Sequence, residues 1–429
     1  MSMPSRFVET LAGLGLAILL GGLAPAGAQP PQRTPAEQHK SHSGAGTDLY
    51  TGRRLNEALE QLNAQHYPEA RAALEPLNLD HLSPYDRGRA EQLFAVIDLR
   101  QGHYGPAREH LVKAIASEGL NDQEVSQVNY QIAQLFMAED KWREGAEALT
   151  QWFATAEKPN SAAYYLLAVA YYQLGDHEAA LEPAEKAIEI AGGRPQESWL
   201  QLLLGIRLER GEYRSAIPLL KQLIEAAPAN KTYWLQLAAS DAQAGSSEDA
   251  GVTLQLAYYA GLLTEAQDVQ RLTEILMQNA IPYRAAQILG QALDQGLIKS
   301  DEKSEELLAN YLVAAQEYEK AIQPLRRAAE LSESGDLYAR VAEIYVQRED
   351  WGNATEVLRL AFAKGNFKKP GKAEILMGLS LYKQKKVGDA RSWFERARKQ
   401  AASREEADAW LKHIEEESRS VTKTSEGAS

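Results

Sequence analysis

The chain has 429 residues, a formal net charge of −13 and no cysteine. The lack of cysteine excludes disulfides, thiolate nucleophiles and thiolate metal sites. The acidic excess argues against a nucleic acid as the partner, because phosphate backbones are bound by clustered Lys and Arg.

The first 28 residues have the features of a secretory signal peptide. Arg6 gives a weakly basic start, an apolar run covers residues 11–23, and residues 26–28 read Ala-Gly-Ala, as a cleavage site requires. The apolar run is shorter than the roughly 20 residues of a membrane-spanning helix. We therefore expect export to the periplasm with cleavage after Ala28. The alternative is an uncleaved membrane anchor.

Residues 29–47 are rich in Pro, Gln and Ser, and such a composition predicts a disordered leader. His39 and His42 lie within it. Two histidines are too few for a metal-binding tract, so we expect both to be solvated.

A helix-pair pattern recurs along most of the remaining chain. Its clearest copy spans residues 161–190, where Leu167-Ala168, Tyr171, Gly175 and Ala180 follow in that order. This order of large and small residues, at a period of about 34, resembles the tetratricopeptide repeat. Alanine, leucine, glutamate and glutamine dominate the composition, which favours an all-helical fold.

Ten candidate pairs are found by aligning the copies on a small residue in the second helix. A small side chain there lets the two helices approach closely, whereas a bulky one would cost about 1–3 kcal/mol through overpacking. The small residues are Ala70, Ala107, Gly145, Ala180, Ala216, Ala250, Ala286, Ala321, Ala354 and Ala390. The pairs are expected to start near residues 51, 88, 126, 161, 197, 231, 266, 302, 335 and 371.

A short turn precedes each small residue and joins the two helices. Glycine is frequent at its first position, where it would end the first helix in the left-handed conformation. An aromatic residue two positions later is expected to pack into the seam between the helices. The turns begin at Gln65, Gly102, Asp140, Gly175, Gly211, Gly245, Ala280, Gln316, Glu349 and Lys385.

A last amphipathic helix is predicted over residues 403–417. Ser403 and Glu406 have capping-box spacing, and a solenoid needs such a helix to cover its last repeat. The predicted fold is an all-α, right-handed α-solenoid of about ten tetratricopeptide helix pairs over residues 48–402, followed by this capping helix. Residues 418–429 are expected to be disordered.

Further motifs resemble one group of tetratricopeptide proteins more closely. They are the second-helix prolines in residues 181–183, 217–219 and 322–325, and the segments 151–153, 233–237, 257–263 and 281–286. Together they look like the periplasmic proteins associated with TonB–ExbB–ExbD systems of Gram-negative bacteria. The resemblance implies an accessory role in energised transport across the outer membrane, typically of iron, with TonB, ExbB or ExbD as partners. It implies no catalytic residue.

The first helix of each pair is expected to line a concave groove, as the fold resemblance implies. Tyrosine offers rigid apolar area and glutamine can bond to backbone amides and carbonyls, so together they suit an extended peptide. The candidate groove residues are Gln127, Tyr130, Gln134, Tyr165, Tyr172 and Gln201. The alternative is an ordinary amphipathic surface without a ligand.

Charge is unevenly distributed along the chain. Residues 359–400 hold 12 Lys or Arg against three acidic residues, whereas residues 1–358 hold 30 basic and 49 acidic residues. The basic stretch could dock an acidic protein segment or anionic lipid head groups, or it could be a solvated face. Its predicted contacts are Lys364, Lys368, Lys369, Lys372, Lys383, Lys385 and Lys386.

No phosphate-binding loop and no His-Glu-x-x-His motif occurs in the repeats. We therefore expect no enzymatic activity, no catalytic residue, no cofactor and no metal. The predicted function is a periplasmic scaffold for protein partners, with the membrane involved only through proximity or an uncleaved anchor. The oligomeric state stays open. Two alternatives are a scaffold for outer-membrane or exopolysaccharide assembly and a self-associating structural protein of the envelope.

Overall fold

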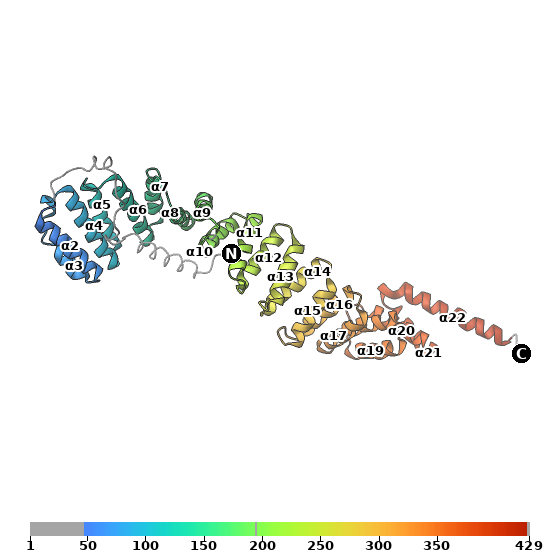
Figure 1. Cartoon of the computed structure of the whole chain (residues 1–429). Helices are drawn as coiled ribbons and strands as arrows, with labels where there is room; N and C mark the ends of the chain where they lie inside the picture. Colours follow the sequence, from blue (N-terminus) through green and yellow to red (C-terminus); the bar gives the residue numbers. More distant parts are fainter. Residues whose placement is uncertain (1–46, 194, 427–429) are drawn as a thin grey trace. The chain divides into compact units, whose positions relative to one another are not determined.

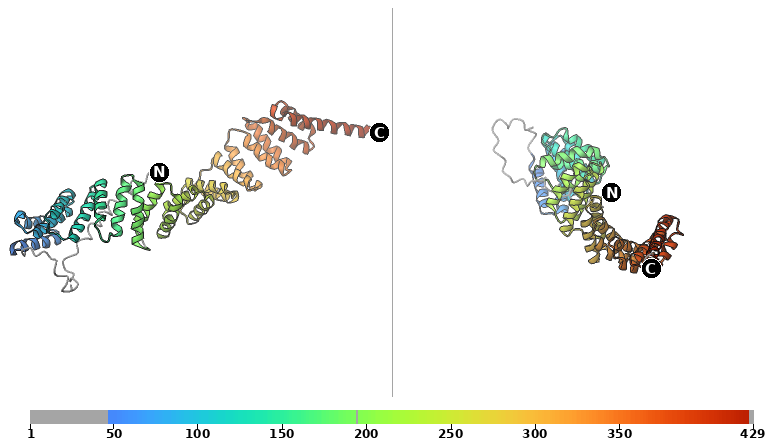
Figure 2. Two further views of the ribbon diagram at one scale, coloured as in Figure 1. Left: turned by 90° about the horizontal axis from the view of Figure 1, so that it is seen from above. Right: turned by 90° about the vertical axis from the view of Figure 1, so that its right-hand side faces the viewer.

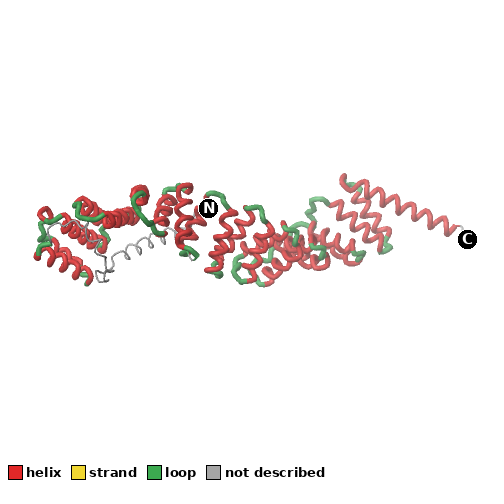
Figure 3. Tube along the Cα trace, turned by 45° about the horizontal axis from the view of Figure 1, so that its top comes forward, coloured by secondary structure: helices red, strands yellow, loops and turns green. Residues whose placement is uncertain are grey.

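The computed structural model describes residues 47–193 and 195–426. The predicted signal peptide, and the predicted leader except for Thr47, lie outside this range. Helices joined by short loops make up the described part, and no strand occurs there (Figure 3). The chain divides into two compact units, Met1–Pro228 and Ala229–Ser429.

Unit 1 holds five antiparallel helix pairs, from α2 to α11 (Figure 1). Its first helices are α2 (Leu49–Asn63), α4 (Pro84–Arg100), α6 (Asp122–Ala138), α8 (Ser161–Gln173) and α10 (Glu197–Glu209). Its second helices are α3 (Tyr67–Leu74), α5 (Tyr104–Ala116), α7 (Trp142–Phe153), α9 (His177–Ala191) and α11 (Tyr213–Ala226). A short 3-10 helix, η2 (Leu79–His81), precedes α4.

Unit 2 holds five further helix pairs and a final helix. Figure 2 shows its helices in two further views. Its first helices are α12 (Lys231–Gln243), α14 (Ala266–Gln278), α16 (Glu302–Ala314), α18 (Asp336–Gln347) and α20 (Pro370–Lys383). Its second helices are α13 (Ser247–Tyr259), α15 (Pro282–Asp294), α17 (Tyr318–Leu331), α19 (Trp351–Lys364) and α21 (Val387–Ala397). The 3-10 helix η3 (Ala401–Ser403) and α22 (Arg404–Glu426) follow.

The ten predicted turns share one backbone conformation. The first residue of every turn has a positive φ, whether it is a glycine or one of six other residues, Gln65, Asp140, Ala280, Gln316, Glu349 and Lys385. At Gly175, for example, the amide bonds to the Tyr172 carbonyl at 3.0 Å and the next amide bonds to the Tyr171 carbonyl at 2.9 Å. This pair of bonds is the Schellman motif, which satisfies the carbonyls at a helix end. The prediction of a left-handed helix end is confirmed.

Replacing glycine by alanine at one of these turns should lower the free energy of unfolding, whereas replacing alanine by glycine at another should raise it. No atom lies within 4 Å of a Cβ added at Gly175, so Gly175→Ala acts through the backbone alone. A non-glycine residue in the left-handed region costs about 1–2 kcal/mol, so this variant should be less stable by about 1 kcal/mol. Ala280 is exposed at the same turn position with φ of 58°, so Ala280→Gly should raise stability slightly. Urea unfolding followed by circular dichroism measures both, and equal effects of the two variants would contradict the argument.

The predicted small residue of every pair is buried, although in α15 the residue equivalent to the other nine is Ala285 and not the predicted Ala286. Nine of the ten are alanines with an exposed fraction of 2 % or less, and Gly145 is buried too. A Cβ added at Gly145 would lie 2.7 Å from the Met137 sulfur, which shows how closely α6 and α7 approach. The small residue therefore sets the spacing of the paired helices.

Helix α22 covers the last pair of unit 2. Ala407, Leu411 and Ile414 are buried, and the Trp410 ring stacks on Phe394 of α21 at 5.6 Å. Ser403 donates its hydroxyl proton to the Ala397 carbonyl at 2.8 Å, which ties the start of α22 to the end of α21. A capping helix at this place agrees with the prediction.

The expected end of that helix is wrong. We predicted disorder from residue 418, but α22 continues to Glu426. The reason is local, because Glu415–Glu417 favour helix and no Gly or Pro interrupts the chain before Gly427. The Ser418 hydroxyl also bonds to the Ile414 carbonyl at 2.8 Å, one turn earlier.

Candidate functional site

Tyr165 does not line an open groove, contrary to the prediction. It lies on α8 with only 3 % of its surface exposed, and its ring stacks on Trp199 of α10 at 5.4 Å. Burial raises the pKa of Tyr165 to about 12, although Ser198 lies close enough to lower that pKa slightly. The neighbouring first helix covers this position, so Tyr165 is part of the core.

Gln134 is also buried, whereas Gln127 on the same side of α6 is exposed. The two residues are seven positions apart, or about two helical turns, so they share one face of the helix. Their different exposure comes from the neighbour, because α8 contacts α6 directly. The open part of this face is therefore its first half, and the prediction for Gln134 is wrong.

The other groove candidates are half-buried. Tyr130 packs on the Trp152 ring at 4.7 Å, and burial raises the pKa of Tyr130 to about 12. Tyr172 lies beside His177 at 5.1 Å, and burial followed by the Glu209 charge raises its pKa. Gln201 donates to Glu197 at 3.0 Å on the same helix. These residues lie on three helices, α6, α8 and α10. Tyr130 also lies close to a second candidate, Gln134, one turn later on α6, and Gln134 acts to lower the pKa of Tyr130 against the larger effect of burial.

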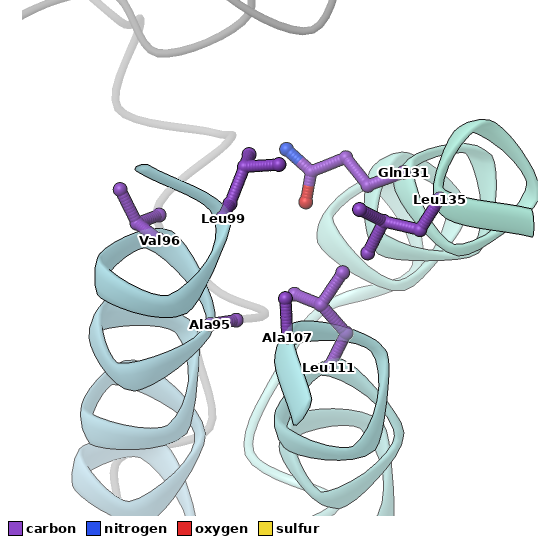
Figure 4. A pocket seen from close by; sticks show the side chains of 7 residues that line it. All are labelled: Ala95, Val96, Leu99, Ala107, Leu111, Gln131 and Leu135. Carbon is purple, nitrogen blue, oxygen red and sulfur yellow. The ribbon is translucent and has the colours of Figure 1, made fainter. Parts of the chain in front are cut away.

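A small apolar pocket opens between α4 and α6, with α5 as its floor (Figure 4). Its cavity volume is about 30 Å³. It is lined by Ala95, Val96, Leu99, Ala107, Leu111, Gln131 and Leu135. Small-molecule sites measure about 300–1,000 Å³, so this pocket has room only for the end of one small side chain. The Gln131 amide lies at the rim opposite Leu99, where it could bond to the backbone of a bound peptide.

Four of the seven predicted basic contacts already have partners. Lys364 caps the end of α17, because its ammonium donates to the Ala329 and Glu330 carbonyls at 2.5 and 2.8 Å. Lys372 pairs with Glu343 at 2.8 Å, Lys383 lies over the Trp351 ring at 5.8 Å, and Lys386 donates to Gln384 at 3.0 Å. Lys364 therefore stabilises the end of α17 within the fold, and its ammonium is already engaged there.

Lys368, Lys369 and Lys385 are exposed and make no ion pair within the described residues. The first two precede α20 and the third follows it. A helix of 14 residues is roughly 20 Å long at 1.5 Å per residue, so these lysines form two separate patches. The single basic surface expected from the sequence is in fact divided between the two ends of one helix.

Within 47–193 and 195–426, no three His, Asp or Glu side chains come together as a metal ion would require. Across the same residues, no helix has both the length and the apolar character that crossing a membrane demands.

Two family models of the tetratricopeptide repeat match this chain, over residues 159–229 and 206–266. No curated protein matches it. Among solved structures, a tetratricopeptide repeat protein from Parabacteroides merdae is 15% identical with a TM-score of 0.38, and the match covers 62% of this chain and 100% of that one. The C-terminal part of a repeat-containing protein from Cytophaga hutchinsonii is 15% identical with a TM-score of 0.38 and coverage of 65% and 95%.

A third structure, YrrB, is described as a tetratricopeptide protein with an unusual peptide-binding site. It is 14% identical with a TM-score of 0.35, and the match covers 42% of this chain and 88% of that one. At these values the three structures say nothing about the function of this chain.

The two matched ranges together span residues 159–266, and the same turn and small residue recur in the pairs outside them. The described chain is thus an all-helical α-solenoid of tetratricopeptide helix pairs. Repeats of this kind generally serve as non-enzymatic scaffolds that bind other proteins along their extended surfaces.

Proposed function

We propose that this chain is a periplasmic scaffold that binds protein components of a TonB–ExbB–ExbD system. Tetratricopeptide repeats over residues 159–266 support a role in protein binding. The small-residue signal at 26–28 supports export, and the proline and aromatic motifs of the second helices support the TonB association. The observation on which the scaffold depends most is the repeat itself, because stacked repeats build an extended surface that can bind other proteins.

Binding would use two kinds of surface in turn. The three unpaired lysines, Lys368, Lys369 and Lys385, would attract an acidic segment of the partner and raise the association rate. The pocket rimmed by Gln131 in unit 1 would then hold a short extended stretch, with one small side chain in the pocket and amides bonded to the backbone. Neither surface needs a cofactor.

Charge reversal at the three free lysines should weaken partner recovery in cells. The variant Lys368→Glu/Lys369→Glu/Lys385→Glu changes exposed side chains only, so the fold should persist. Crosslinking in cells, followed by pull-down and mass spectrometry, should recover TonB, ExbB or ExbD with the wild type. The variant should recover roughly tenfold less, the equivalent of about 1.4 kcal/mol.

A matched control is the same reversal at lysines that already have partners, Lys372→Glu/Lys386→Glu. It should have a smaller effect on recovery. If wild type recovers outer-membrane or exopolysaccharide assembly factors in place of TonB components, the proposed partner is wrong. If it recovers only further copies of itself, the chain is a self-associating envelope protein.

A further inference from the structure

An open crevice of about 510 Å³ lies in unit 1 between the second helices α7 and α9, with the first helix α8 as its floor. Phe153 of α7 and Tyr164 and Tyr171 of α8 line it, and all three rings are half-buried. The Phe153 and Tyr164 rings lie 4.5 Å apart. The crevice is therefore lined by aromatic surface that stays open to solvent.

Two prolines complete the lining, Pro159 before α8 and Pro183 inside α9. Pro183 has no amide hydrogen, so the Ala179 carbonyl lacks the donor that an α-helix would normally supply. Ala179 itself lines the crevice. The wall thus offers a hydrogen-bond acceptor next to aromatic rings, a combination that suits an extended proline-rich segment in the polyproline II conformation.

The α9 wall carries a net negative charge, because two carboxylates share one cation. Lys186 also lines the crevice, and its pKa is raised by the Glu189 hydrogen bond and further by the charge of Glu182. Glu182 lines the crevice, is exposed and has no ion pair within the described residues. The other exposed glutamates along α9, Glu178, Glu185 and Glu189, pair with Arg210, Arg207 and Lys186. An occupant with a cation close to its prolines would therefore complement this crevice.

We propose that the crevice is the docking site of the chain's own residues 30–35, Pro-Pro-Gln-Arg-Thr-Pro, which lie outside the described range. The prolines would pack on Phe153, Tyr164 and Tyr171, and Arg33 would pair with Glu182. The inference is independent of the TonB association, since it concerns a different surface of the chain.

The connecting chain is long enough for this contact. Thr47 is held at the start of α4, where its hydroxyl donates to Asp86 at 2.7 Å. Packed helices lie about 8–10 Å apart, so the four steps from α4 to α8 amount to no more than about 40 Å. The twelve residues from Pro35 to Thr47 can span about 40 Å when extended.

A photocrosslinker in the full-length chain tests the proposal. Benzoylphenylalanine in place of Thr150, an exposed residue of the crevice wall on α7, should crosslink to residues 29–40 of the same molecule. The control position is Lys221, which is exposed and holds the equivalent place in α11. Mass spectrometry identifies the crosslinked peptides, and the yield should not change on dilution because the contact is intramolecular.

Charge reversal separates specific docking from chance proximity. Arg33→Glu should lower the crosslink yield from position 150 up to about fivefold, as expected for loss of one exposed ion pair. Adding Glu182→Arg should restore the yield. No crosslink to residues 29–40, equal yields from positions 150 and 221, a yield unaffected by Arg33→Glu, or capture of another protein at position 150 would each overturn the proposal.

Discussion

Phe394→Ala should remove about 3–5 kcal/mol from the stability of the C-terminal repeats, the range found for large aromatic residues in a core. The ring is fully buried and stacks on Trp410 of α22 at an interplanar angle of 4°. It also lies against α20, where a Cβ added at Gly378 would come within 2.7 Å of the ring. Three helices therefore share this one side chain, and its loss leaves a cavity that none of them can fill alone.

Hydrogen exchange of the full-length chain measures this effect locally. Amides of α20, α21 and the first half of α22 should exchange faster in the variant, whereas those of α12 should not change, because repeats contact mainly their neighbours. The control is Tyr259→Ala, an aromatic change in the same unit at a side chain that is 61 % exposed and contacts Arg284. That change should cost less than about 1 kcal/mol. Equal protection loss in both variants would contradict the role assigned to Phe394.

The helix pairs could be predicted from the sequence because their signals are local. A left-handed turn and a small residue five positions later recur at one spacing, and each acts between helices that are adjacent in the chain. The exception is the turn at Ala280, where the buried Ala285 holds this position and the predicted Ala286 lies one residue too far. Ala180 and Gly175 are examples, and the structure places both as expected. Even turns without glycine, such as that at Gln316, follow the same hydrogen-bond pattern. The predicted end of the last helix was wrong, because residues 418–426 contain no Gly or Pro that would end a helix.

The candidate site was harder to predict, because exposure depends on helices distant in the sequence. Tyr165 has the position of a groove residue within its own helix, but Trp199 of a later pair covers it. The lysines before and after α20 belong to one basic stretch of sequence, yet the length of the helix separates them. The crevice beside α8 has one signal in the local sequence, which is Pro183 inside the predicted second helix. A proline there has no amide hydrogen, so it predicts a backbone carbonyl without its usual donor on that wall of the crevice.

Gly119→Ala should destabilise unit 1 by about 3 kcal/mol or more, at or beyond the upper end of ordinary overpacking. The connection between α5 and α6 passes so close to the start of α4 that an added Cβ would lie 2.1 Å from the Pro84 carbonyl carbon and oxygen. These are backbone atoms, so no side-chain rotation can relieve the clash. The connection would have to move away from α4.

The matched control is Gly193→Ala, since no atom lies within 4 Å of a Cβ added there and its φ is not positive. That variant should change stability by less than about 0.5 kcal/mol. Urea unfolding measures both, and hydrogen exchange should show the loss of protection in α4 and the start of α6 for Gly119→Ala alone. A Gly119→Ala variant as stable as the control would mean that the α5–α6 connection is not held against α4 in solution. The connection would then not cover the start of α4. The apolar pocket formed by α4, α5 and α6 would also have a different shape in solution.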